Sequence, residues 1–154
     1  MGDSFEAEAY TLPAKVAGKR NAVIYCRVGK KKDAGTSKGS YQYNVCLGFA
    51  QCAGLNIIAD YEDAGTYQSC LLPQLNAAIR EVEAGHADVL LVEDYDRLNC
   101  DPVQDVLVKR RVEAAGGILV AADLCRDGSM AKQNDQLLMT LLGDYRRAVL
   151  DGRV

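Results

Sequence analysis

The chain has 154 residues and a formal net charge of −3, and 49% of its residues are hydrophobic while 25% are charged. This length and composition are typical of one globular domain whose core is large enough to fold without disulfides or a structural metal. The slight acidity argues against strong autonomous binding of nucleic acid, because domains that grip DNA by themselves are usually basic.

The sequence gives no indication of a metal or cofactor site or of a membrane anchor. Its six cysteines occur singly and its only histidine is His86, so a zinc site is not expected. No glycine-rich phosphate-binding motif is present, and we therefore expect no cofactor. Residues 1–20 contain no apolar run that would suit a signal peptide or a membrane span, which predicts a cytoplasmic protein with free thiols.

The first predicted elements are a leader, a strand and a helix. Residues 1–20 lack periodicity and are interpreted as a flexible leader or a short extension packed on the domain surface. Residues 22–28 form an apolar run typical of a buried strand. After a polar stretch, Ser40 is suited to cap a helix over residues 41–53, which would end at Gly54.

The middle of the chain alternates further strands and helices. Residues 56–61 are predicted as a strand, residues 63–66 as a loop, and residues 71–84 as a helix because their apolar side chains recur at helical spacing. Residues 89–92 (VLLV) are predicted as a central strand. The predicted helix over 103–115 follows them.

The last predicted elements are a strand over residues 118–122 and a helix over residues 134–151 with a broad apolar stripe. The whole pattern predicts an α/β fold, an open and mostly parallel sheet of four to five strands flanked by helices. We divide the chain into a leader (1–20), an α/β domain (21–133) and a C-terminal helix (134–154).

Two arginines stand where parallel sheets commonly place reactive groups, at the carboxyl ends of strands. Arg27 closes the first predicted strand, and Arg97 belongs to a charged segment that follows the third. Guanidinium groups bind phosphate through paired hydrogen bonds, so the two arginines suggest a phosphodiester site. Alternatively, each arginine forms a structural salt bridge with a neighbouring carboxylate; the candidates are Asp60, Glu62, Asp63, Asp94 and Asp96.

A second interpretation of the charged segment is a magnesium site. Glu93, Asp94 and Asp96 supply the oxygen ligands that Mg²⁺ prefers, as in receiver-type phosphoacceptor domains. Such a domain would also need an acidic pair after its first strand, where this chain has Arg27.

In order and spacing, four segments resemble the catalytic domain of serine recombinases, the resolvase and invertase family. They are YCRVG at 25–29, SYQYN at 40–44, YEDAG at 61–65 and DYDRLN at 94–99. The resemblance covers roughly residues 21–147. It implies a domain that acts on DNA through a phosphoserine intermediate, without metal or ATP, with arginines holding the phosphate.

The resemblance carries over only part of the family's site. Arg27, Asp96 and Arg97 match family positions, and the resemblance assigns them catalytic roles. Gly29 stands where the family has its nucleophilic serine. Glycine has no side chain with which to attack phosphorus, so we expect cleavage by the family mechanism to be absent.

Two further family arginines are replaced. Leu72, before Pro73, and Cys100 stand where the family has positively charged groups that stabilise the transition state. Three losses in one site indicate a degenerate active site. Ser37, Ser40 and Cys26 remain as alternative nucleophiles, which leaves an active recombinase as a second hypothesis.

The resemblance also implies partners. DNA contacts are expected from Arg27, Lys30, Lys31, Arg97, Arg146 and Arg147, weak by themselves or made through a partner. The helix over 134–154 matches the start of the family's dimerisation helix, so we expect a homodimer, or a hetero-oligomer with a recombinase. The family's DNA-reading domain is not expected in this chain, whose residues 134–154 match only the start of the dimerisation helix. A protein-interaction module without a DNA role is the third hypothesis.

Overall fold

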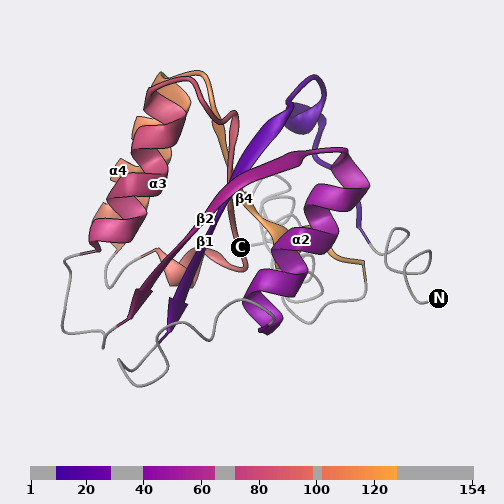
Figure 1. Cartoon of the computed structure of the whole chain (residues 1–154), viewed down its shortest axis with the longest axis horizontal. Coiled ribbons are helices and arrows are strands. Elements are labelled where there is room, and N and C mark those ends of the chain that lie inside the picture. Colours follow the sequence, from indigo (N-terminus) through magenta and orange to yellow (C-terminus); the bar gives the residue numbers. More distant parts are fainter. Residues whose placement is uncertain (1–9, 29–39, 65–71, 99–101, 128–154) are drawn as a thin grey trace, which may run out of the picture.

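The computed structural model describes residues 10–28, 40–64, 72–98 and 102–127, and these form an α/β domain around one parallel sheet (Figure 1). The sheet has the order β2-β1-β3-β4. Its strands are β1 (Asn21–Val28), β2 (Asn56–Ala64), β3 (Val89–Val92) and β4 (Ile118–Ala121). The predicted fold class, an open parallel sheet flanked by helices, is confirmed.

Helices cover both faces of this sheet. On one face lies α2 (Tyr41–Ala53), and on the other lie α3 (Pro73–Glu83) and α4 (Pro102–Ala114) (Figure 1). Side chains alternate along each strand, so β1 and β3 supply buried residues to two separate apolar cores. This double burial explains why both strands read as nearly continuous apolar runs.

Helix α2 begins and ends where the sequence predicts. The Ser40 hydroxyl accepts a hydrogen bond from the Tyr43 N–H at 3.4 Å, and Gly54 follows the last turn with a φ of 70°. A positive φ is strained for residues with a Cβ, which is why glycine suits this position.

The predicted loop over residues 63–66 is wrong at Asp63 and Ala64, because β2 continues through both residues. They pair with Arg27 and Val28 of β1, and Asp63 is buried. Aspartate disfavours strands in general, yet here its carboxylate has buried hydrogen-bond donors, and these tertiary contacts override the local preference. Residues 65–71 lie outside the described residues.

The strand predicted over residues 118–122 ends one residue earlier, at Ala121. A short helix, α5 (Ala122–Cys125), follows it and was not predicted. The chain turns there because the Asp123 N–H donates to the Glu93 carbonyl at 2.9 Å, which draws the turn against the segment that follows β3.

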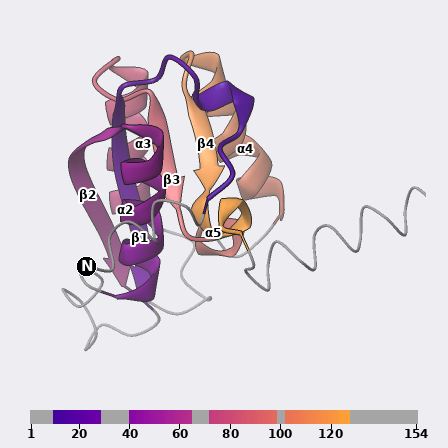
Figure 2. The same cartoon turned by 90° about the vertical axis from the view of Figure 1, so that its right-hand side faces the viewer.

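Residues 10–20, the described part of the leader, pack along the domain. The leader includes a 3-10 turn, η1 (Ala14–Val16), whose Val16 is buried, and Tyr10 forms an antiparallel bridge with Arg126. It runs beside β4 (Figure 2). From the sequence, residues 1–20 are interpreted either as a flexible leader or as an extension packed on the domain surface. Residues 10–20 agree with the second interpretation.

The predicted helix over residues 134–151 lies outside the described residues. Among the described helices, none is long and apolar enough to cross a membrane.

Candidate functional site

The carboxyl edge of the sheet brings together the segments that follow β1 and β3. The two strands are parallel neighbours, and Ile24 pairs with Leu91. Arg27 lies three residues beyond Ile24, and the charged segment begins at Glu93, so both reach the same edge. The edge predicted from the sequence as the reactive one therefore carries both arginine-bearing segments.

Arg27 is held in place through its backbone by the side chain of Gln42. The Gln42 amide nitrogen donates to the Arg27 carbonyl at 2.9 Å, and its amide oxygen accepts from the Arg27 N–H at 3.0 Å. Both residues are buried, with Arg27 only 6% exposed. This paired contact fixes the end of β1 against the first turn of α2.

Arg97 lies on a 3-10 turn, η3 (Tyr95–Arg97), and pairs with an internal carboxylate. Its Nε is 3.0 Å from Glu93 Oε1 and 3.8 Å from Asp96 Oδ1. Burial raises the pKa of Glu93, an effect that the Arg97 charge partly offsets. The predicted salt bridge of Arg97 thus exists, but its short contact is with Glu93, which the sequence did not single out as a partner.

Asp63 joins β2, β1 and α3 at the same edge. One carboxylate oxygen accepts from the Tyr25 hydroxyl at 2.9 Å and from the Leu75 N–H at 2.9 Å, and the other accepts from the Gln74 N–H at 3.1 Å. Burial and the nearby Asp63 charge raise the pKa of Tyr25, so the phenol stays protonated and donates. The carboxylate also caps α3, whose first N–H groups have no partner within the helix.

One more charged group at this edge, Asp123 with Arg126, was not singled out from the sequence. After β4, the Asp123 carboxylate accepts from the Tyr41 hydroxyl at 2.8 Å and from Arg126 Nε at 3.1 Å, and Arg126 also donates to the Tyr41 oxygen at 2.7 Å. The signal was available, because Asp123 and Arg126 follow a predicted strand.

Among the described residues, the carboxylates of this edge are not grouped as a metal site would require. Within the described ranges, no three His, Cys, Asp or Glu side chains come together in a way that would hold a metal ion. The magnesium interpretation of Glu93, Asp94 and Asp96 is therefore not supported. Burial and the neighbouring Asp96 instead raise the pKa of Asp94.

Residues 22–150 match the family model described as the resolvase N-terminal domain. The chain belongs to this family. A comparison with curated protein sequences found no significant match.

Solved structures share the fold of this resolvase-family domain. The C-terminal catalytic domain of ISC1926 TnpA, an IS607-like serine recombinase, is 19% identical with a TM-score of 0.58, over 77% of this chain and 79% of that one. The N-terminal catalytic domain of TP901-1 integrase is 21% identical with a TM-score of 0.56, over 84% and 98%. A resolvase family site-specific recombinase from Streptococcus pneumoniae is 19% identical with a TM-score of 0.58, over 87% and 95%.

The described residues include four of the family positions singled out from the sequence. Arg27, Asp96 and Arg97 lie at the carboxyl edge, and Leu72 is buried before α3. The remaining positions lie outside the described residues: Gly29, Lys30, Lys31, Cys100, Arg146 and Arg147.

Leu72 is part of an apolar core. It is 8% exposed and belongs to the same buried cluster as Tyr25, Leu75 and Leu98. An arginine here would have to place its guanidinium among these side chains or displace them. The leucine at position 72 is thus part of the packing of the domain.

Proposed function

We propose that this resolvase-family domain takes part in site-specific DNA recombination without cutting DNA itself, by assembling with its own copies or with an active recombinase. The observation that carries the proposal is the identity of residue 29 in the sequence. Gly29, at the nucleophile position, has no side chain, and a phosphoserine intermediate needs a hydroxyl within reach of phosphorus.

The groups that would stabilise the transition state are also depleted. Leu72 replaces an arginine and packs in the apolar core, and Cys100 replaces another. Each lost donor of this kind typically lowers a rate by a factor on the order of 10²–10³. The replacements are therefore expected to act together with Gly29 against catalysis.

The half-buried arginines at the edge are partly neutralised by the protein. Arg97 is held by Glu93 at 3.0 Å, and Arg126 by Asp123 at 3.1 Å. A DNA phosphate would compete with these carboxylates, and such competition supports weak binding. We propose DNA contacts at Arg27, Arg97, Lys30, Lys31, Arg146 and Arg147, strong only when a partner holds the DNA.

Assembly would use the C-terminal segment, residues 134–154. Its apolar stripe is wider than one domain core needs, and the segment matches the start of the family's dimerisation helix. We propose that it pairs either with a second copy or with an active family member.

Two of the three alternative nucleophiles, Cys26 and Ser40, are disfavoured by their environments, whereas Ser37 lies outside the described residues. Cys26 is 1% exposed, and the Ser40 hydroxyl accepts the hydrogen bond that caps α2. A buried thiol and a capping hydroxyl are poorly placed to reach a DNA phosphate, so we retain the non-cleaving role.

Covalent capture tests the proposal without knowledge of the DNA target. The purified protein is incubated with a pool of random-sequence nicked duplexes, and adducts that survive denaturation are counted, with an active serine recombinase on its own site as the positive control. We expect no adduct. An adduct mapped by mass spectrometry to Ser37, Ser40 or Cys26 would falsify the proposal and restore the active-enzyme hypothesis.

The assembly role has its own measurement. Sedimentation of the protein alone, and of its mixture with a recombinase encoded in the same genome, is expected to show a complex, and the complex is expected to bind DNA more tightly than the protein does. Salt-independent self-association with no DNA affinity in either sample would instead favour a pure interaction module.

A further inference from the structure

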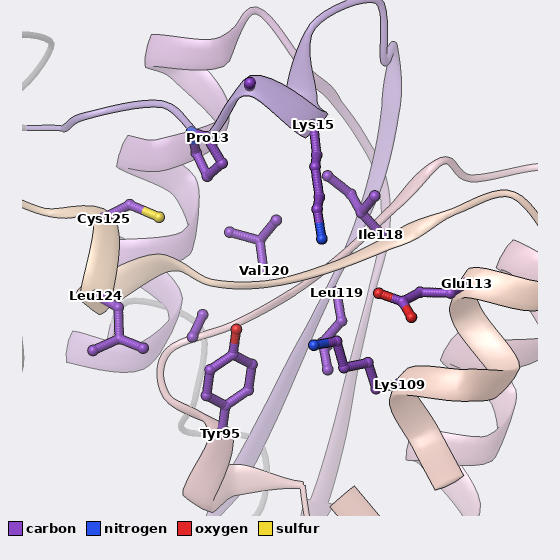
Figure 3. Close-up of a pocket in the computed structure, with 12 residues that line it drawn as sticks. Pro13, Lys15, Tyr95, Lys109, Glu113, Ile118, Leu119, Val120, Leu124 and Cys125 are labelled. Carbon is purple, nitrogen blue, oxygen red and sulfur yellow. The ribbon is translucent and has the colours of Figure 1, made fainter. Parts of the chain in front are cut away.

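A cavity of about 380 Å³ lies along the outer edge of β4, and its lining reaches Tyr95 and Leu124, which are neighbours in sequence of the carboxyl-edge residues discussed above (Figure 3). Ile118, Leu119, Val120 and Ala121, four consecutive strand residues, all line it. Successive side chains point to opposite faces of a sheet, so only a cavity at the edge of the strand can contact all four.

The walls of this cavity come from both sides of the sheet. The leader contributes Pro13 and Lys15, helix α4 contributes Lys109 and Glu113, and Tyr95 closes one side with its phenol (Figure 3). Ligand cavities typically occupy roughly 300–1,000 Å³ and combine an apolar lining with a few polar groups. This cavity meets both criteria.

The cationic groups of the cavity are available to a ligand. Neither Lys15 nor Lys109 forms an ion pair within 4.0 Å with any residue in the part of the chain that the structure describes. Two ammonium groups face one carboxylate, Glu113, so the lining carries a net positive charge. A lining that is apolar but carries ammonium groups suits a ligand with an apolar body and an anionic group.

The strand backbone adds polar groups at the same place. The Ile118 N–H donates to the Asp88 carbonyl at 2.9 Å, toward β3. Because backbone groups alternate in direction along a strand, the N–H and carbonyl of Leu119 point to the outer edge. They can bond a polar group of a ligand that lies against β4.

We propose that this cavity binds an organic anion with an apolar, preferably aromatic body. Its carboxylate or phosphate contacts the ammonium groups of Lys15 and Lys109, and its body packs on Ile118, Val120 and Leu124 beside the Tyr95 ring. The bound molecule contacts the leader, α4 and β4 together, so its binding holds the leader against the domain. This inference does not depend on the proposed role in recombination.

The first test compares three probes that share one ring system: naphthalene-2-carboxylate, 2-naphthyl phosphate and the neutral 2-naphthamide. Titration calorimetry on the full chain is combined with methyl NMR shifts of Ile118, Val120 and Leu124. We expect both anions to bind at least about threefold more tightly than the amide and to shift these methyl groups. The tighter anion identifies the head group, whereas equal binding of all three probes, or no binding, overturns the proposal.

Two variants test the location. Lys109→Ala is expected to weaken anion binding about three- to fivefold, as the loss of one partly exposed charge pair predicts, while Arg110→Ala, the next residue on α4, should leave it unchanged. Ala14→Phe places a ring into the cavity from an exposed position and should abolish binding of all three probes. Anion binding that survives Ala14→Phe, or that falls equally in both α4 variants, would place the site elsewhere.

Discussion

At the residue scale, Asp63 of β2 forms hydrogen bonds with β1 and with the start of α3. Its carboxylate accepts three hydrogen bonds, one from the Tyr25 hydroxyl and two from backbone N–H groups of α3. The residue is 6% exposed, so water cannot replace these donors if the acceptor is lost. Such a group contributes to stability because its removal leaves buried donors without a partner.

We predict that Asp63→Asn destabilises the domain by about 2–3 kcal/mol, because an amide NH₂ replaces one accepting oxygen and faces a donor. Asp60→Asn, on the exposed side of the same strand, serves as the matched control and should be nearly neutral. Urea unfolding followed by circular dichroism measures both. Equal midpoints for the two variants would show that the Asp63 contacts do not stabilise the fold.

At the element scale, helix α3 begins without help from its own N-cap residue. Leu72 makes no side-chain capping bond, Pro73 opens the helix, and the capping oxygens come from Asp63. Proline is favoured at this first position because its missing N–H is not needed there. The side chain at position 72 therefore has no capping role and packs in the apolar core.

We predict that Leu72→Arg lowers the unfolding free energy by about 2–4 kcal/mol, since it removes a buried apolar side chain and places a charge in or beside the core. Leu72→Met keeps volume and apolarity and should cost less than about 1.5 kcal/mol. Thermal unfolding of both variants gives the comparison. A fully stable Leu72→Arg protein would mean that the domain still accommodates the family's arginine.

At the scale of the whole molecule, the leader completes the core on the α2 face. The Tyr10 hydroxyl donates to the Val45 carbonyl at 2.9 Å, and its ring packs edge-on against Phe49 at 6.1 Å. Gly48 makes room for this ring, because a Cβ there would lie 2.6 Å from the Tyr10 hydroxyl oxygen. Burial raises the pKa of Tyr10 to about 12, so the phenol remains a donor at neutral pH.

We predict that deletion of residues 1–19 destabilises the domain by about 3 kcal/mol, because Val16 and the Tyr10 ring lose their apolar contacts and Phe49 becomes accessible. Deletion of residues 1–9 alone keeps all of these contacts and should change the urea midpoint little. If both deletions have the same effect, the packing of residues 10–19 does not contribute to stability.

The sequence alone was sufficient for the strands and helices whose signals are local. Residues 89–92 form β3 as predicted because a short apolar run between breakers suits a buried parallel strand. Ser40 and Gly54 mark the ends of α2 because capping and a positive φ depend on single residues. Arg27 and the segment with Arg97 were correctly expected at one edge of the sheet, since the carboxyl ends of parallel strands meet there. Their catalytic and DNA-binding roles remain predictions.

Only the tertiary structure decided which charged groups meet. Tyr41 and Asp123 are 82 positions apart, and Tyr25 and Asp63 are 38 apart, so no local pattern connects them. The same reason applies to the leader. Its composition resembles that of a flexible tail, but in the folded chain Tyr10 and Val16 pack in the apolar cluster on the α2 face. Local sequence determines the ends of an element such as α2, because capping and periodicity act within one or two turns, whereas the ends of β2 and β4 also depended on tertiary contacts. The pairing of buried polar groups depends on distances that only the folded chain establishes.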